Sequence, residues 1–461
     1  MKKQNLRLTL AVGTIGILTA LTACSAGGTG SASTDASKAD PNAKVTITVG
    51  DEPTADKAAD RANFLTMVQQ FEKANPNITV KPSTEYWQAQ TFQAKLAGGT
   101  LPTTMNVSLT YSKQLIANHQ LPNMTPYLKQ AGLLGELNPL ALNNVKDSKG
   151  DVYTVPYGLF SVGISYNRAI FTKAGLDPNK PPTTWDEVRA DAKQIHDNVP
   201  GVAGYAQLTT NNTGGWMLTT MTYSMGGTVT NKAGTKTDMG PATEQALQLL
   251  HNMRWVDNSM GSQFLYNQDD IRKSFSAGKI GMVLQAPDIY TQAIPTYGMK
   301  PADFGQSALP QANGTNGTLT GGTIAMFNAK ATPNQLLAAA KWVKFKEFEK
   351  YFDKTTAVAG AKADSASNKA VGTPGLPPVA DSINSRYLGW IKDYINVPLD
   401  QFKGYTSSTL PLIPEPADAQ NTYAALDPVV QKVLTDQNAN IKQLISTAAQ
   451  TIDRNLSQAA G

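Results

Sequence analysis

Adjacent carboxylates are side chains whose types could carry out acid–base chemistry. Asp51 with Glu52 and Asp269 with Asp270 are such pairs in this sequence. A glycosidase needs two carboxyl groups roughly 5–10 Å apart across the bond that it cleaves, and adjacency in the sequence does not show that separation. The three histidines are isolated, and the sequence has no H-E-x-x-H motif, G-x-S-x-G elbow or G-x-x-x-x-G-K-[ST] phosphate loop. We therefore expect a protein that is not an enzyme and that uses neither a cofactor nor a metal.

Cys24 is the only cysteine, so no disulfide, Cys-based metal site or thiol nucleophile is available. A basic start, an apolar run at residues 8–21 and small residues precede it, as is typical of a secretory signal. The run is shorter than the ~20 residues that a membrane span needs. Leu21-Thr22-Ala23-Cys24 resembles a bacterial lipobox, which would make Cys24 the lipidated first residue of the mature chain. The alternative is an uncleaved membrane anchor.

The charge of the chain argues against a nucleic-acid partner. The formal net charge is +5, and removal of residues 1–23 takes away three cations and no anion, which leaves +2. Nucleic-acid binding needs a basic face, and the lysines and arginines form no cluster. With 41% apolar and 16% charged residues the composition is that of a globular protein, and 461 residues predict two domains.

Polar side chains that follow predicted strands are the first candidates for ligand contacts. Residues 45–49 alternate as a strand, an amphipathic helix follows, and residues 78–80 form the next strand. This order predicts a parallel, doubly wound sheet, whose ligands bind beyond the carboxyl ends of the strands. Asp51 and Glu52 follow the first strand and Tyr111 follows a later one, so we expect ligand contacts there. The alternative for Asp51 and Glu52 is a solvated turn.

Residues 153–188 carry the most specific pattern of the chain. They contain Y-T-V-P-Y-G, then Y-N-R-A-I-F-T-K-A-G-L, then P-P-T-T-W-D-E-V. In this order and spacing, the three motifs resemble the first crossing between the lobes of the extracellular solute-binding proteins that feed ABC importers. The resemblance is closest to the sugar-binding branch that includes maltose-binding protein, and it covers essentially all of the mature chain. Thr184 and Glu187 also have the spacing of a capping box at a helix start.

The resemblance implies an α/β, periplasmic-binding-protein-like fold. Each of two lobes would be a doubly wound mixed sheet flanked by helices, and several crossings would act as a hinge. A ligand would close the cleft between the lobes by preferring the closed state. We expect a signal peptide at 1–23, a flexible tether at 24–43, one lobe from 43–156 with 321–354, and the other from 157–320 with 355–461.

The resemblance also implies where ligand contacts lie. Trp216 directly follows a Gly-rich loop in a region that supplies aromatic contacts in the family, so we interpret it as a flat platform, with core packing as the alternative. Where relatives carry Gly-Pro-Trp, this chain has Ala286-Pro287-Asp288. That departure leaves the identity of the ligand open. The expected ligand contacts are Trp216, Asp51, Glu52, Tyr111, Tyr157, Asp288, Tyr290, Gly322, Trp390 and Asn421.

These observations predict a lipid-anchored substrate-binding protein of an ABC importer. It would be an extracytoplasmic monomer that captures a carbohydrate, an oligosaccharide by resemblance, and delivers it to a membrane permease. The ATPase would be a separate chain, because this one has no phosphate loop. Three alternatives remain: a surface glycan-active enzyme, an adhesin without a small ligand, and a binding protein for a peptide or polyol.

Overall fold

The computed structural model describes residues 39–459. The predicted signal peptide, lipidation at Cys24 and most of the predicted tether lie outside these residues. None of the described helices is long and apolar enough to cross a membrane.

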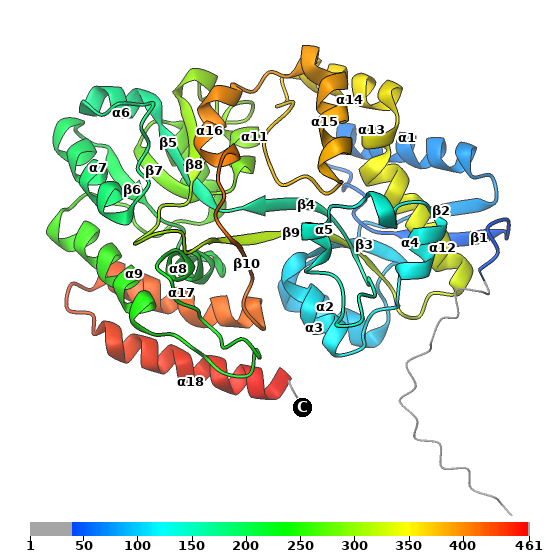
Figure 1. The fold of residues 1–461 in the computed structure, drawn as a ribbon, viewed down its shortest axis with the longest axis horizontal. Coiled ribbons are helices and arrows are strands. Elements are labelled where there is room, and N and C mark those ends of the chain that lie inside the picture. Colours follow the sequence, from blue (N-terminus) through cyan, green and yellow to red (C-terminus); the bar gives the residue numbers. More distant parts are fainter. Residues whose placement is uncertain (1–38, 460–461) are drawn as a thin grey trace, which may run out of the picture. The chain divides into compact units, whose positions relative to one another are not determined.

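The first sheet combines parallel and antiparallel strands in the order β2-β1-β3-β9-β10, and β4 pairs with β9 (Figure 1). β1 is parallel to β2, with Val45 opposite Ile78, and β9 is antiparallel to β3. The predicted doubly wound mixed sheet is therefore confirmed. Its strands are β1 (Val45–Val49), β2 (Ile78–Pro82), β3 (Thr104–Ser108), β4 (Val155–Ser161), β9 (Thr318–Phe327) and β10 (Leu412–Pro414).

Helices with one apolar stripe cover the first sheet and make the core of the first lobe. In α1 the stripe consists of Phe64, Val68 and Phe71, which are buried. Trp342 of α12 packs edge-on against Phe64 and Phe71, at ring-centroid distances of 6.0 and 5.3 Å. The elements are α1 (Ala58–Ala74), α2 (Ala89–Gly98), the 3₁₀ turn η2 (Leu109–Tyr111), α3 (Ser112–Ala117), α4 (Thr125–Gln130), η3 (Leu134–Glu136), α5 (Pro139–Leu142), α12 (Pro333–Val343), the π-helical turn η7 (Lys344–Phe348) and α13 (Glu349–Phe352).

The second sheet has the order β6-β7-β5-β8 and forms the core of the second lobe. β6 and β7 are parallel, so their carboxyl ends lie at the same edge. The strands are β5 (Gly163–Asn167), β6 (Ala203–Ala206), β7 (Ile280–Gln285) and β8 (Phe304–Ala308).

Helix α7 (Trp185–Asn198) of the second lobe begins where the sequence predicts. The Thr184 hydroxyl accepts a hydrogen bond from the Glu187 N–H at 3.2 Å, and the Glu187 carboxylate accepts one from the Thr184 N–H at 3.0 Å, so the capping box of α7 is confirmed. The helices and helical turns of the second lobe are α6 (Arg168–Ala174), α7 (Trp185–Asn198), α8 (Thr213–Ser224), α9 (Pro241–His251), the π-helical turn η4 (Asn252–Val256), α10 (Gln268–Ser276), η5 (Pro287–Ile289), α11 (Tyr290–Ala293), η6 (Pro301–Asp303), η9 (Leu399–Phe402), α16 (Lys403–Thr406), α17 (Ala419–Thr435) and α18 (Ile441–Ala459).

Strands β4 and β9 run side by side between the two cores (Figure 1). Within β9, Leu319 belongs to the core of the second lobe, whereas residues 324–327 belong to that of the first. A Cβ on Gly322 would lie 2.5 Å from the Gly158 carbonyl oxygen, so glycine is needed for the strands to approach here. The crossing between the lobes is therefore a hydrogen-bonded ladder rather than a loose linker.

The segment after residue 354, expected to cross between the lobes, begins as helix α14 (Lys354–Ala366). It continues through a bridge between Leu376 and Leu159 into α15 (Asp381–Ile391) and η8 (Lys392–Tyr394). Val379 and Ile383 are buried with the core of the first lobe. The lobe boundaries at 156, 321 and 355 stay predictions.

Candidate functional site

A cavity of about 700 Å³, here called the inter-lobe pocket, is lined by residues of both lobes. Its volume lies within the range of about 300–1,000 Å³ that is usual for small-molecule sites. The first lobe contributes η2 and α3, including Leu109 and Lys113. The second lobe contributes Tyr223 at the end of α8, residues 413–418 at the end of β10 and directly after it, and the turn at 228–235.

Glu415 places a carboxylate in the wall of the inter-lobe pocket. Its Oε2 accepts a hydrogen bond from the Tyr423 hydroxyl. Burial raises the pKa of Glu415 to about 7, against the opposing effect of that hydrogen bond. No described residue donates a hydrogen bond to its other oxygen, Oε1. A Cβ on Gly321 would lie 2.9 Å from Oε1 and 2.8 Å from the ring of Phe160, so only glycine lets both groups approach β9.

Asp418 adds a second carboxylate to the lining of the pocket. It adopts a left-handed backbone conformation at the start of α17, with φ of 44°, and accepts two hydrogen bonds from Asn421 at 3.0 and 2.9 Å. Burial raises the pKa of Asp418. Burial, and then the charge of Asp418, raise the pKa of Tyr111 to about 12. Tyr111 of the first lobe and Asp418 of the second therefore lie within electrostatic reach of each other.

Lys113 brings a cation to the same pocket from the first lobe. Burial lowers the pKa of its ammonium group. An ammonium group only donates hydrogen bonds, whereas ionised carboxylates only accept them. The pocket therefore presents carboxylates from the second lobe, Asp238, Glu415 and Asp418, and an ammonium group from each lobe, Lys113 and Lys232. Among residues 39–459, no group of three or more His, Cys, Asp or Glu side chains could hold a metal ion.

Trp216 lies in the first turn of α8, and its ring meets that of Phe160 edge-on at 6.0 Å. Asp427 of α17 holds this helix start, because its carboxylate accepts hydrogen bonds from the N–H groups of Asn212 and Gly215, at 2.7 and 2.8 Å. Trp216 is partly buried and also packs on the core of the second lobe. Phe160 therefore contacts the ring of Trp216 and also packs against Gly321. Gly321 in turn lies beside the Glu415 carboxylate in the wall of the pocket.

Asp51 lies in a separate cluster within the first lobe. Its φ is 65° and its carboxylate accepts a hydrogen bond from the Asn106 N–H at 2.8 Å. Burial raises the pKa of Asp51 to about 6. Burial and the charges of Glu347 and Asp51 raise the pKa of Tyr157. The hollow beside Asp51 measures only about 10 Å³.

The other predicted contacts lie in different surroundings. Glu52 is paired with Arg61 at 2.8 Å. Asp288 is 56% exposed and pairs with the buried Arg272 at 2.6 Å. Tyr290 is buried, with its ring on Phe304 and Phe402, and Trp390 packs in a small third cluster beneath Arg386.

Of the ten predicted contacts, all of which the structure describes, none lines the inter-lobe pocket. Tyr111 and Asn421 adjoin it through Asp418, Gly322 lies in the strand that crosses beside it, and Trp216 adjoins it through Phe160. The ligand-binding roles of the ten stay predictions.

Sequence reasoning missed the charged residues of the pocket itself. Glu415 stands between Pro414 and Pro416, directly after β10. A polar residue between two prolines has a restricted backbone, and that signal was available in the sequence. No comparable signal marks Lys113. It lies in a short helix, and the sequence of such a helix does not show which side chain faces the other lobe.

Comparisons with known proteins agree with this fold. The sn-glycerol-3-phosphate-binding periplasmic protein UgpB of Brucella abortus is 26% identical over 208 residues, which are 42% of this chain and 45% of that protein. The chain spans about half the length of the curated relatives that it matches, such as three putative binding proteins of Brucella.

Solved structures show the likeness over nearly the whole chain. UgpB from Mycobacterium tuberculosis in complex with glycerophosphocholine has a TM-score of 0.69 at 17% identity, covering 90% of this chain and 100% of that one. An ABC transporter solute-binding protein from Thermotoga lettingae, bound with alpha-D-tagatose, has a TM-score of 0.66 at 18% identity, covering 89% and 99%. The chain therefore has the two-lobed fold of these proteins.

The family comparison covers more than half of the chain. The model of a family described as bacterial extracellular solute-binding protein matches residues 54–347. That range includes the motifs at 153–188 and both strands of the central ladder. The chain belongs to the bacterial extracellular solute-binding protein family.

Proposed function

We propose that this protein captures a neutral, polyhydroxylated solute, a sugar or polyol, in the inter-lobe pocket and delivers it to the permease of an ABC importer. The observation that carries the proposal is a cavity of about 700 Å³ whose lining comes from both lobes and includes the carboxylate of Glu415. A solute that touches both lobes stabilises the closed arrangement by the difference in its affinity for the two states.

The polar groups of the pocket favour hydroxyl groups as ligands. The free Oε1 of Glu415 can accept a hydrogen bond from a hydroxyl, and Lys113 can donate one to a hydroxyl or ring oxygen. A phosphate monoester would bring negative charge into a lining that holds three carboxylates, those of Asp238, Glu415 and Asp418, against two ammonium groups. We therefore favour a neutral solute, although relatives are named for glycerol 3-phosphate and bind glycerophosphocholine.

The aromatic pair of Trp216 and Phe160 supports a saccharide among the neutral solutes. A pyranose has one relatively apolar face, which an indole ring covers while it excludes water. We propose that Trp216, which adjoins the inter-lobe pocket through Phe160 without lining it, is that platform, fixed by the edge-on contact with Phe160 and by the cap that Asp427 provides for α8. Solved relatives with this fold include proteins bound to tagatose and to ribitol.

The proposal includes an extracytoplasmic location and a lipid anchor at Cys24. It rests on the sequence Leu21-Thr22-Ala23-Cys24 and on the extracellular character of the family. The intact mass of the mature protein is expected to show a chain that begins at Cys24 and carries lipid. An unmodified Cys24 would contradict the anchor and leave the solute proposal standing.

A thermal-shift screen of neutral sugars, polyols and their phosphate esters tests the proposal. A solute at 100 times its Kd stabilises the protein by about 2.7 kcal/mol, which a melting curve detects. The best solute is then titrated calorimetrically against Glu415→Gln, Trp216→Ala and the control Asp400→Asn, a carboxylate that is 91% exposed. At pH 8, above the pKa of about 7, we expect Glu415→Gln to weaken binding about 10- to 100-fold, because a charged acceptor is lost.

Two results would contradict this assignment. A phosphate ester that binds more tightly than its neutral parent would contradict the preference for neutral solutes. Wild-type affinity in Glu415→Gln would contradict the assignment of the inter-lobe pocket as the binding site. Chemical change of a bound glycan on long incubation would favour the alternative of a glycan-active enzyme.

A further inference from the structure

A second cavity, of about 460 Å³, lies at the opposite end of the second lobe's sheet and is here called the distal pocket. Gly201 and Val202 in its lining directly precede β6, so the pocket lies at the amino-terminal end of that strand, away from its carboxyl end. The rest of the lining consists of His196, Arg254, Asn258, Gly261 and Ser262.

Arg254 is held firmly at the wall of the distal pocket. Its guanidinium carbon lies 4.4 Å from the ring centroids of both Trp255 and Phe264. Its Nε donates a hydrogen bond to the Leu434 carbonyl at 3.3 Å, and the neighbouring Trp255 donates to Val433 at 2.9 Å. Since the rings and the Leu434 carbonyl fix the group, the terminal nitrogens at its outer edge remain for a ligand.

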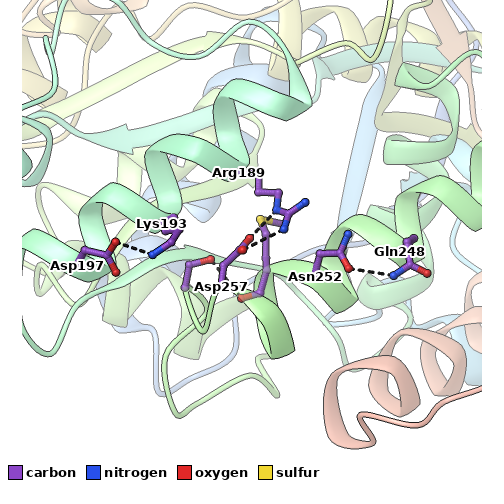
Figure 2. A network of polar contacts seen from close by, with 8 residues as sticks. Arg189, Lys193, Asp197, Gln248, Asn252 and Asp257 are labelled. Carbon is purple, nitrogen blue, oxygen red and sulfur yellow. Dashed lines mark hydrogen bonds and ion pairs between the residues drawn. The ribbon is translucent and has the colours of Figure 1, made fainter.

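No acidic residue lines the distal pocket. Asp257, three residues after Arg254, has both carboxylate oxygens engaged by Arg189, at 2.5 and 3.0 Å (Figure 2). Asp197, next to His196, pairs with Lys193 at 2.6 Å (Figure 2). Burial lowers the pKa of Arg254. Asp257 and Asp197 are therefore each paired with a cation other than Arg254.

Four side chains of the lining bring unused donors to the same space. Within residues 39–459, no group accepts a hydrogen bond from the terminal nitrogens of Arg254, the ring of His196, the amide of Asn258 or the hydroxyl of Ser262. A histidine ring carries at least one N–H in each protonation state. A rigid guanidinium edge surrounded by neutral donors suits an oxyanion with several acceptor oxygens.

We propose that the distal pocket binds a phosphate group, with Arg254 as the principal contact and His196, Asn258 and Ser262 as further donors. This site is separate from the solute site and does not depend on the solute proposal. The phosphate group can come from a dissolved phosphate ester or from the headgroup of an anionic lipid, and the chemistry of recognition is the same for both.

Calorimetric titration with inorganic phosphate tests the site directly, in wild type, Arg254→Met and Lys193→Met. Methionine keeps an apolar stem between the two rings and removes the charge. We expect phosphate to bind wild type saturably and Arg254→Met about 10- to 100-fold more weakly, as loss of a charged hydrogen-bond donor implies. Lys193→Met removes a nearby exposed cation that does not line the pocket, and because it also frees Asp197 we expect phosphate affinity to fall by no more than about twofold.

Further variants separate binding from folding. Asn258→Ala and Ser262→Ala change loop residues and should each weaken phosphate binding about 3- to 10-fold even if Arg254→Met does not fold. Sedimentation with phosphatidylglycerol vesicles, against phosphatidylcholine vesicles, distinguishes the two sources. Arg254-dependent binding to the anionic vesicles supports a lipid headgroup, and phosphate binding without vesicle binding supports a dissolved ester.

Three results would overturn the proposal. They are the absence of saturable phosphate binding in wild type, wild-type affinity in Arg254→Met, and an equal loss in Lys193→Met and Arg254→Met. The last result would mean that phosphate responds to the general charge of this surface.

Discussion

The two ends of helix α17 border pockets of opposite chemical character. At its start, Asp418 and the nearby Glu415 line the inter-lobe pocket with carboxylates. At its end, the carbonyl groups of Val433 and Leu434 hold Trp255 and Arg254 beside the distal pocket. A helix of 17 residues is about 25 Å long, so two distinct environments lie one helix length apart.

The difference follows the direction of the helix dipole. The amino-terminal end of a helix favours negative charge and the carboxyl-terminal end favours positive charge, each by about 0.3–1 kcal/mol. Acids stand at the first end of α17 and a guanidinium at the second. Neither Glu415 nor Arg254 has an ion-pair partner among the described residues, so each remains able to meet a ligand. The comparison teaches that a charged residue held by burial and stacking, rather than by a salt bridge, is the better candidate for binding.

The largest effect is expected from Gly215→Ala, which should lower stability and weaken ligand binding in both pockets at once. A Cβ at this position would lie 2.3 Å from the Tyr423 carbonyl oxygen and 2.6 Å from the Tyr423 Cα, so α8 and α17 would have to separate. Overpacking of this kind costs about 1–3 kcal/mol or more. We expect urea unfolding to show a loss of about 3 kcal/mol, with weaker binding at both pockets.

Gly360→Ala is the matched control for that substitution. Gly360 lies within α14, and a Cβ there meets nothing within 4 Å. Alanine should stabilise this helix by about 0.5–1 kcal/mol. Unchanged stability in Gly215→Ala would show that the two helices do not constrain each other.

A dependence of stability on pH should arise from the inter-lobe pocket. Burial raises the pKa of Glu415 from its ordinary 4.5 to about 7, so the folded protein binds this proton more tightly than the unfolded chain does. The free energy of unfolding should therefore fall as the pH rises between about 4.5 and 7, by up to about 3 kcal/mol from this group. Urea unfolding at pH 5 and pH 8 should show a smaller fall in Glu415→Gln than in wild type.

Asp51 contributes a fall of the same sign, because burial raises its pKa to about 6, and it is present in both proteins. The comparison of wild type with Glu415→Gln therefore isolates the pocket residue. Equal falls in the two proteins would mean that Glu415 titrates in the folded protein as it does in the unfolded chain.

The smallest expected effect is that of Asp257→Asn near the distal pocket. Arg189 is 35% exposed and Asp257 is 8% exposed, so solvent weakens their pair and its loss should cost about 1 kcal/mol or less. The freed charge of Arg189 should raise phosphate affinity by about twofold. Asp197→Asn, in a more exposed pair, should change stability by less than about 0.5 kcal/mol. A marked fall in phosphate affinity in Asp257→Asn would show that Asp257 supports the site rather than competing with the ligand.

Local signals in the sequence were sufficient for single elements, whereas the two-lobed fold was predicted from the resemblance of the motifs at 153–188. The capping box at Thr184 and the strand–helix–strand order of residues 45–80 depend on neighbours within a few positions, and both are confirmed. The candidate site depends on distant segments. Lys113, Glu415 and Tyr223 meet only because β9 and β10 bring three parts of the chain together. Tyr290 shows the same limit, since its spacing could not show that Phe304 and Phe402 enclose its ring.

The position of β9 has a consequence for how the chain reaches its folded state. β3 pairs on one side with β1 and on the other with β9, which is made only after the strands of the second sheet. During synthesis the first sheet therefore has an open edge at β3 until residues 318–327 follow. Open edges invite pairing with other chains, and distant strand pairs form slowly. A nascent chain that stops before β9 would be expected to aggregate, so the first lobe is complete only once most of the second has been made.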